Sequence, residues 1–112
     1  MRRGEIWWAA LSAPIGSEPG FRRPVVIVSN NVFNESGLRT LLTIPVTSNL
    51  ARENFPGNVR LSARRTGLSR DSVAIAIQIA TTDKRQLIDR IGRVPDEVMQ
   101  RIDGALRLAL AI

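Results

Sequence analysis

The run Val25–Val28 constrains the fold most strongly, because four consecutive β-branched apolar residues directly follow Pro24. A short apolar run of this kind is typical of a strand that is buried on both faces. Such a strand lies near the centre of a sheet. Proline has no N–H for a β-ladder, so Pro24 is expected at the first position of this strand. We therefore predict a central strand over Pro24–Ser29.

A polar segment bounded by glycine leads into this strand. Gly16, Pro19 and Gly20 break any regular element, so the segment is expected to be a loop that carries Arg22 and Arg23 to the strand. A guanidinium held at a rigid strand end suits a planar anion such as phosphate. The alternative is a solvated loop with a surface arginine, and the loop chemistry alone favours this alternative.

The rest of the chain predicts more short strands, which have β-branched and aromatic residues between turn signals. They are expected at Glu5–Leu11, Thr40–Thr47, Asn58–Ser62 and Ile88–Val94, and Ser72–Thr81 is expected to hold two strands or one bent strand. Pro45 indicates that its strand lies at an edge or contains a bulge. Asn30–Gly37 is expected to be a turn region, and Asp83–Leu87 a helical turn.

A helix is predicted to begin at Pro95, because proline is tolerated in the first helical turn and the carboxylates of Asp96 and Glu97 complement the helix dipole there. Apolar residues then recur at helical spacing as far as Ala109. Several short strands followed by one helix predict a mainly β fold with a C-terminal helix, in which the sheet is small and strongly curved or closed into a barrel.

Charge and composition restrict the function. The 112-residue chain is long enough for one domain with one modest core. Its net charge of +6 indicates a polyanionic partner, of which nucleic acid is the first candidate. Because the sequence contains no cysteine and no histidine, a structural zinc site and a histidine-based catalyst are excluded. No apolar run approaches the roughly 20 residues of a membrane span, so we expect a soluble, cytoplasmic protein.

Short segments along nearly the whole chain resemble the MazF/PemK family of toxin endoribonucleases, in the same order and at matching spacings. They are Arg3–Trp7, Gly16–Glu18, Arg23–Val25, Pro45–Ser48, Asp71–Val73, Gln78–Ile79 and Ile91–Leu110. The resemblance implies a single toxin domain over residues 1–112 with an SH3-like barrel and a C-terminal helix. It also implies a homodimer that cleaves single-stranded RNA without a metal or other cofactor, and a MazE-like antitoxin that inhibits it.

The resemblance places the catalytic arginine at Arg23, the catalytic hydroxyl at Thr47 and an assisting carboxylate at Glu18. A guanidinium is in effect always protonated, so we assign Arg23 to stabilising charge on the phosphate, with Glu18 as the first candidate for the general base. Without the resemblance, Glu18 is equally well a surface loop carboxylate. Thr47 on its own is better explained as a strand-end hydroxyl that bonds its own backbone.

RNA contacts are expected from Ser17, Arg22, Ser48, Asn49 and Gln78. Gln78, however, is better explained from the sequence by a structural role, as a polar side chain bonded to a neighbouring strand, than by an RNA contact. The cleaved motif is expected to be read by the loops Ser12–Arg22 and Asn49–Gly57, through contacts to unstacked bases. The arginines at positions 64, 65 and 70 are expected to form a solvated face that attracts phosphate generally.

Two other functions stay open. A CcdB-like DNA gyrase inhibitor has the same barrel, but that family acts through a tryptophan near its C-terminus, and this chain ends in Leu108–Ile112. A non-catalytic RNA-binding barrel is the other alternative. The low aromatic content of 4%, with no tyrosine, is unfavourable for a binder that depends on base stacking.

The adjacent tryptophans Trp7 and Trp8 must face opposite sides of their strand. One is expected to fill the core and the other to lie at the surface or in an interface. Together with the apolar content of so short a chain, they leave more hydrophobic surface than one small barrel can bury. This independently favours a homodimer.

Overall fold

The computed structural model describes residues 1–11 and 21–112. Its strands are β1 Glu5–Ala10, β2 Arg22–Ile27, β3 Thr40–Thr47, β4 Asn58–Leu61, β5 Ser72–Ile75, β6 Ala80–Asp83 and β7 Leu87–Arg93. The helices are α1 Asn31–Asn34, α2 Ala63–Thr66 and α3 Asp96–Leu110, and there are 3₁₀ turns at η1 Leu50–Asn54, η2 Ala76–Gln78 and η3 Lys84–Gln86. The mainly β fold with a C-terminal helix is confirmed.

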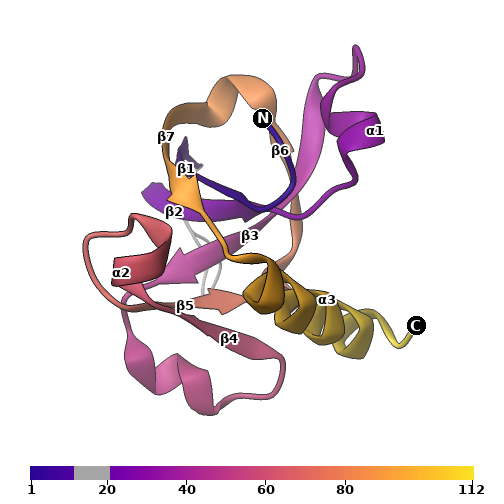
Figure 1. Ribbon diagram of the computed structural model, residues 1–112. Helices are drawn as coiled ribbons and strands as arrows, with labels where there is room; N and C mark the ends of the chain where they lie inside the picture. Colours follow the sequence, from indigo (N-terminus) through magenta and orange to yellow (C-terminus); the bar gives the residue numbers. More distant parts are fainter. Residues whose placement is uncertain (12–20) are drawn as a thin grey trace.

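All seven strands belong to one bent antiparallel sheet in the order β4-β5-β3-β2-β1-β7, with β6 also paired to β3 (Figure 1). The long strand β3 pairs with β2 along one edge. Along its other edge it pairs with β6 over Thr40–Thr43 and with β5 over Val46–Thr47. The segment Ser72–Asp83 is therefore two strands separated by η2, as one of the sequence interpretations expected.

The expectation that Pro45 marks an edge or a bulge is wrong, because Pro45 is buried in the most extensively paired strand and lies opposite Val25 of β2. The reason is the break at η2. On the β5/β6 edge, the ladder is interrupted between Thr43 and Val46. A residue without an N–H is therefore tolerated in β3 at a position where one edge of the strand already lacks partners.

The central position of β2 is confirmed, since it lies between β1 and β3 and Val25, Val26 and Ile27 are fully buried. The position expected for Pro24 is wrong, because Pro24 is the third residue of β2 and lies opposite Trp8 of β1. The ladder with β3 begins only at Val25, so Pro24 needs a partner on one side alone. Arg22 and Arg23 consequently belong to the strand and not to the loop before it.

The two faces of the sheet have separate cores. The larger core packs under α3 and contains Ile6, Val26, Ile44 and Ile102, all of which are fully buried. The smaller core contains Ala9, Val25, Ile27, Leu41 and Leu87, and Trp7 packs against it. Trp8, on the opposite side of β1, is 36% exposed. The expectation of one inner and one outer tryptophan is thus confirmed.

The terminal helix begins as predicted, with Pro95 at its N-cap and Asp96 and Glu97 in the first turn. The helix packs against β4 and η2. Figure 1 shows it beside β4, at the edge of the sheet. The turn expected after β2 contains the short helix α1. Asn30 caps this helix by accepting a hydrogen bond of 2.9 Å from the N–H of Val32. Within the described residues, no helix is both long and apolar enough to cross a membrane.

A close backbone contact joins α2 to β7. A Cβ on Gly67 would lie 2.7 Å from the carbonyl oxygen of Ile91, and Gly67 has a positive φ of 89°, which side chains rarely adopt. A Cβ on Gly92 would overlap the carbonyl oxygen of Thr66. The connection between α2 and β5 is therefore held firmly against the sheet.

Gly92→Ala is expected to lower the free energy of unfolding by about 1–3 kcal/mol, because backbone must move to admit the methyl group. Gly104→Ala is the matched control. Gly104 lies inside α3 with nothing within 4 Å of the added Cβ, so this change should stabilise by roughly 0.5–1 kcal/mol. Denaturant unfolding of both variants measures the difference. Equal stabilities would contradict the close contact between α2 and β7.

Candidate active site

Arg23 lies near the start of β2, opposite Ala9 of β1, and its side chain is half-buried. Its Nε atom is buried and has no hydrogen-bond partner among the described residues. A buried donor without a partner carries a free-energy penalty, commonly about 1–3 kcal/mol. Within the same residues no carboxylate forms an ion pair with Arg23. Among the described residues, therefore, no carboxylate competes with an anionic ligand for this guanidinium.

Thr47 is the last residue of β3, and Arg23 is the second residue of the neighbouring strand β2. The ladder between β2 and β3 joins Val25 to Pro45, and continuing this antiparallel register by two residues places Arg23 opposite Thr47. Residues that lie directly opposite each other share a face of the sheet. This extrapolation, two residues beyond the last observed pair of Val25 and Pro45, puts the guanidinium and the hydroxyl that the sequence resemblance singled out on the face that carries the smaller core.

The Thr47 hydroxyl accepts a hydrogen bond of 3.2 Å from the N–H of Asn49. This is the local bond to backbone that a structural interpretation expects at a strand end. A hydroxyl that accepts through a lone pair keeps its proton, so Thr47 can still donate to a ligand. Asn49 is also engaged, because its side chain accepts from the N–H of Ala51 at 3.2 Å and caps η1.

Arg22 and Ser48 lie one residue from this pair, and successive side chains of a strand alternate between its faces. The Arg22 guanidinium lies over the ring of Trp8, 5.9 Å from the ring centroid. Ser48 lines a cavity of about 320 Å³ that Trp8 and Pro24 also line. Of the expected RNA-contacting residues, Arg22 and Ser48 therefore both lie on the Trp8 side of the sheet, which is the face opposite Arg23.

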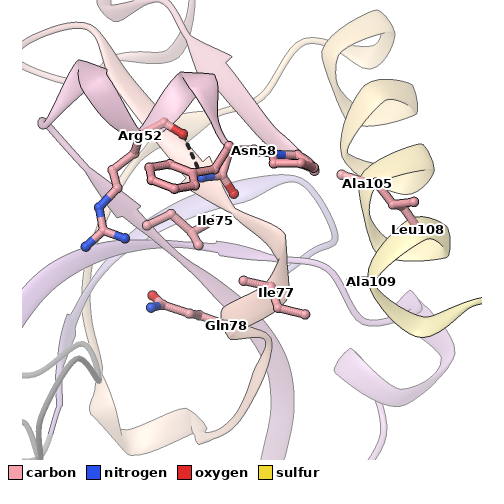
Figure 2. A pocket seen from close by; sticks show the side chains of 11 residues that line it. Arg52, Asn58, Ile75, Ile77, Gln78, Ala105, Leu108 and Ala109 are labelled. Carbon is pink, nitrogen blue, oxygen red and sulfur yellow. Dashed lines mark hydrogen bonds between the residues drawn. The ribbon is translucent and has the colours of Figure 1, made fainter.

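Gln78 lies elsewhere, in a cavity of about 400 Å³ between η1, η2 and α3 (Figure 2). The cavity is otherwise largely apolar, with Ile77 and Leu108 on its wall, and the Asn58 amide closes one side by donating to the carbonyl oxygen of Arg52 at 2.8 Å. No hydrogen bond joins the Gln78 side chain to another part of the described chain, so the expected bond to a neighbouring strand is absent.

Ser17 and Glu18 lie outside the described residues, as does most of the loop Ser12–Arg22. The assignment of Glu18 as the candidate general base therefore stays a prediction. The second expected specificity loop, Asn49–Gly57, contains η1 and borders the Gln78 cavity. Across residues 1–11 and 21–112, no three side chains of Asp, Glu, Cys or His come together in a way that could hold a metal ion.

One group of residues was missed by the sequence interpretation. The segment between α2 and β5 folds back over Trp8, so that Ser69 and Arg70 line the same cavity as Ser48. Asp71 anchors this segment by accepting from the N–H of Ala63 at 2.9 Å and from Arg60 at 3.1 Å, and these two bonds hold the pKa of Asp71 below its usual value. Two signals for this surface were present in the sequence, the expectation that one of Trp7 and Trp8 faces outward and the basic residue Arg70, but nothing joined them.

The chemistry of the Arg23–Thr47 pair suits a phosphodiester. A planar, permanently charged donor and a neutral hydroxyl donor can share the oxygens of one phosphate, and both are fixed by the end of a sheet. Donors held in place before reaction stabilise the charge that develops on phosphate oxygens.

Comparison with known proteins identifies relatives over the whole chain. Residues 2–110 match the family described as PemK-like, MazF-like toxin of type II toxin-antitoxin system. Endoribonuclease MazF6 of Mycobacterium tuberculosis is 44% identical over 96% of this chain and 95% of its own length. Endoribonuclease EndoA of Bacillus subtilis is 37% identical over 100% of this chain and 96% of its own. The solved structure "Endoribonuclease in complex with its cognate antitoxin from Mycobacterial species" superposes with a TM-score of 0.75 at 26% identity, covering 100% of this chain and 94% of that one.

Proposed function

Because the chain belongs to the family of PemK-like, MazF-like toxins of type II toxin-antitoxin systems, we propose that it is an endoribonuclease toxin that cleaves single-stranded RNA. The observation that carries the proposal is the half-buried Arg23, whose Nε lacks a partner in the described chain. Extrapolation of the β2–β3 register, which would put Arg23 opposite Thr47, supports it. The named activity of the relatives favours this function over a gyrase inhibitor on the same fold.

The reaction uses the 2′-hydroxyl of the RNA as its nucleophile. The 2′-oxygen forms a bond to phosphorus and loses its proton, while the bond to the 5′-oxygen breaks and that oxygen gains a proton. The products are a 2′,3′-cyclic phosphate and a 5′-hydroxyl. Arg23 and Thr47 donate to the phosphate oxygens as negative charge builds up, and Glu18 takes the proton of the 2′-hydroxyl in this scheme. No step requires a metal ion.

The physiological setting follows from the family. We propose that residues 1–112 form a single cytoplasmic toxin domain whose partner is a small antitoxin of the MazE type. The mycobacterial endoribonuclease with a similar fold was solved together with its cognate antitoxin. A flexible acidic or apolar segment of such a partner would be attracted by the net charge of +6 and could cover a large part of the toxin surface when it folds on binding.

Expression of the protein is expected to arrest bacterial growth, and coexpression of the small open reading frame next to its gene should restore growth. The arrest should be absent with Arg23→Ala, which removes the guanidinium whose Nε has no hydrogen-bond partner among the described residues. Colony counts after induction measure both effects. Normal growth with the intact protein in several hosts would contradict the toxin assignment, and arrest by the Arg23→Ala variant would contradict the role of Arg23.

We also propose that the protein is a homodimer. Apolar side chains of Phe33, Leu42, Leu110 and Ile112 are exposed and line one groove of about 420 Å³ between α1, β3 and α3. A groove with this much exposed apolar surface is suited to a second copy of the chain. It supports the homodimer that the paired tryptophans and the resemblance suggested.

Sedimentation at micromolar concentration and moderate salt is expected to give a dimer, and Leu42→Asp should shift the equilibrium towards the monomer. Leu38→Asp is the matched control, because Leu38 is also exposed but does not line this groove. A monomeric parent protein would overturn the homodimer. A dimer weakened equally by both variants would show that the groove is not its interface.

A further inference from the structure

Trp8 occupies an unusual position in β1. The pairing of β1 with β7 shifts register twice near Trp8, once between Ile6 and Trp7 and once between Trp8 and Ala9. Such irregularities re-aim side chains and are frequent beside functional sites. The ring is left 36% exposed although it stands in an inner strand of the sheet. An exposed indole in this place is available for a ligand.

The cavity beside Trp8, which we call the Trp8 pocket, has walls of mixed chemistry. Leu68 and Ile91 provide apolar surface, and the hydroxyls of Ser48 and Ser69 have no hydrogen-bond partner among the described residues. Arg70 adds a guanidinium at the edge of the pocket. Its volume of about 320 Å³ lies at the lower end of the roughly 300–1,000 Å³ found for small-molecule sites.

The pocket is built in advance of binding. The contact of Gly67 and Gly92 holds its floor against β7, and Asp71 fixes the segment that carries Ser69 and Arg70. Arg22 lies over the Trp8 ring, 5.9 Å from its centroid, so one side of the aromatic system already carries a cation. Neither Arg22 nor Arg70 forms an ion pair with any carboxylate of residues 1–11 and 21–112.

The Trp8 pocket adjoins the Arg23–Thr47 pair but opens on the opposite face of the sheet. Trp8 lies opposite Pro24, the residue after Arg23, and Ser48 directly follows Thr47. The two places are therefore one residue apart along both β2 and the end of β3, so an RNA strand with a phosphate at Arg23 would reach the pocket by passing around this end of the sheet. Planar aromatic surface, free hydroxyls and two guanidinium groups together suit an unstacked nucleobase and its phosphate.

From this arrangement we infer that the Trp8 pocket is a base-binding subsite that takes one unstacked nucleobase of single-stranded RNA next to the cleaved bond. The inference rests on the proposed ribonuclease function, and it assigns part of the sequence preference to Trp8, Ser48 and Ser69. The base stacks on Trp8, and the two serine hydroxyls bond to its edge. The chain is poor in aromatic residues overall, but this one ring is sufficient for a single base.

Binding is tested without cleavage by fluorescence. In Trp7→Phe, Trp8 is the remaining tryptophan of the two in the chain. Titration with single-stranded 2′-deoxy oligonucleotides of random sequence, which lack the nucleophile, should quench Trp8 saturably. Trp8→Phe, in which Trp7 remains, is the matched control and should show little quenching. Equal quenching in both variants would overturn the subsite. Quenching by free nucleoside monophosphates at the same concentrations as by oligonucleotides would assign the pocket to free nucleotides instead.

Cleavage supplies the second test. Trp8→Ala is expected to slow cleavage roughly 5- to 100-fold, which is the usual effect of losing one stacked base, and to relax the base preference at one position beside the cut. Trp8→Phe, which keeps an aromatic ring, should retain most of the cleavage rate and most of the base preference. Ser69→Leu fills the pocket from its exposed edge without touching the core, and it should change the same position even where Trp8→Ala fails to fold. Unchanged preference in both variants would overturn the subsite. Failure of the parent protein to cleave RNA would instead overturn the proposed function. The fluorescence titration would then decide by itself whether the Trp8 pocket binds a nucleobase.

Discussion

Arg23→Ala is expected to lower the rate of single-stranded RNA cleavage by at least about 10²–10³-fold, which is the usual effect of removing one preorganised donor to a developing oxyanion. The guanidinium is half-buried on β2, and its Nε has no partner among the described residues. In the proposed mechanism, a substrate phosphate supplies that partner. The side chain therefore contributes most where negative charge is greatest, in the transition state.

The matched control is Arg64→Ala, which removes the same formal charge from an exposed position in α2. The single-turnover cleavage rate of Arg23→Ala should be lower than that of Arg64→Ala by the same factor of about 10²–10³. The affinities of the two variants for an uncleavable 2′-deoxy strand should differ much less. If Arg23→Ala abolishes binding and cleavage equally, the side chain serves only to hold RNA. If it cleaves at the rate of Arg64→Ala, the assignment of Arg23 is wrong.

Thr47→Ala is the second large effect, with an expected loss of about 10²–10³-fold in cleavage rate. Continuing the register beyond Val25 and Pro45 would place Thr47 opposite Arg23, and the Thr47 oxygen accepts from the N–H of Asn49 while its hydroxyl proton has no acceptor among the described residues. Thr47→Ser keeps the hydroxyl and should retain most of the activity. Thr40→Ala, at the exposed far end of β3, should be close to the parent protein.

The double variant Arg23→Ala/Thr47→Ala separates a shared role from two independent ones. Donors that act on the same phosphate are strongly non-additive, so the double variant should lose little more than the worse single variant. Losses that multiply fully would contradict a common phosphate. Thermal unfolding of each variant checks that the loss of the bond to Asn49 has not simply destabilised the turn after β3.

Parts of the fold could be predicted because they depend on local patterns. The run Val25–Val28 required a buried strand in any sheet, and Pro95 with its two acidic neighbours determined where the last helix starts. The position of Pro45 could not be predicted in this way. It depends on the break at η2, a feature of a segment some thirty residues later in the chain.

The candidate site shows the same division. Arg23 and Thr47 were named from a resemblance, and their placement opposite each other depends on extending the pairing register of β2 and β3, which no local pattern shows. Gln78 was grouped with them by the same resemblance and lies in another cavity. The Trp8 pocket was missed because it forms only when the segment after α2 folds over β1, through glycine contacts that single residues in a sequence do not reveal.

Incubation of the purified protein with mixed RNA in excess EDTA, followed by sequencing of the new 5′ ends, tests the central claim most directly. The account predicts cleavage at one short motif, 5′-hydroxyl and 2′,3′-cyclic phosphate ends, no cleavage by Arg23→Ala, and none of a strand whose 2′-hydroxyl at the cut site is replaced by hydrogen. Cleavage of that deoxy strand, or loss of all cleavage in EDTA, would contradict it.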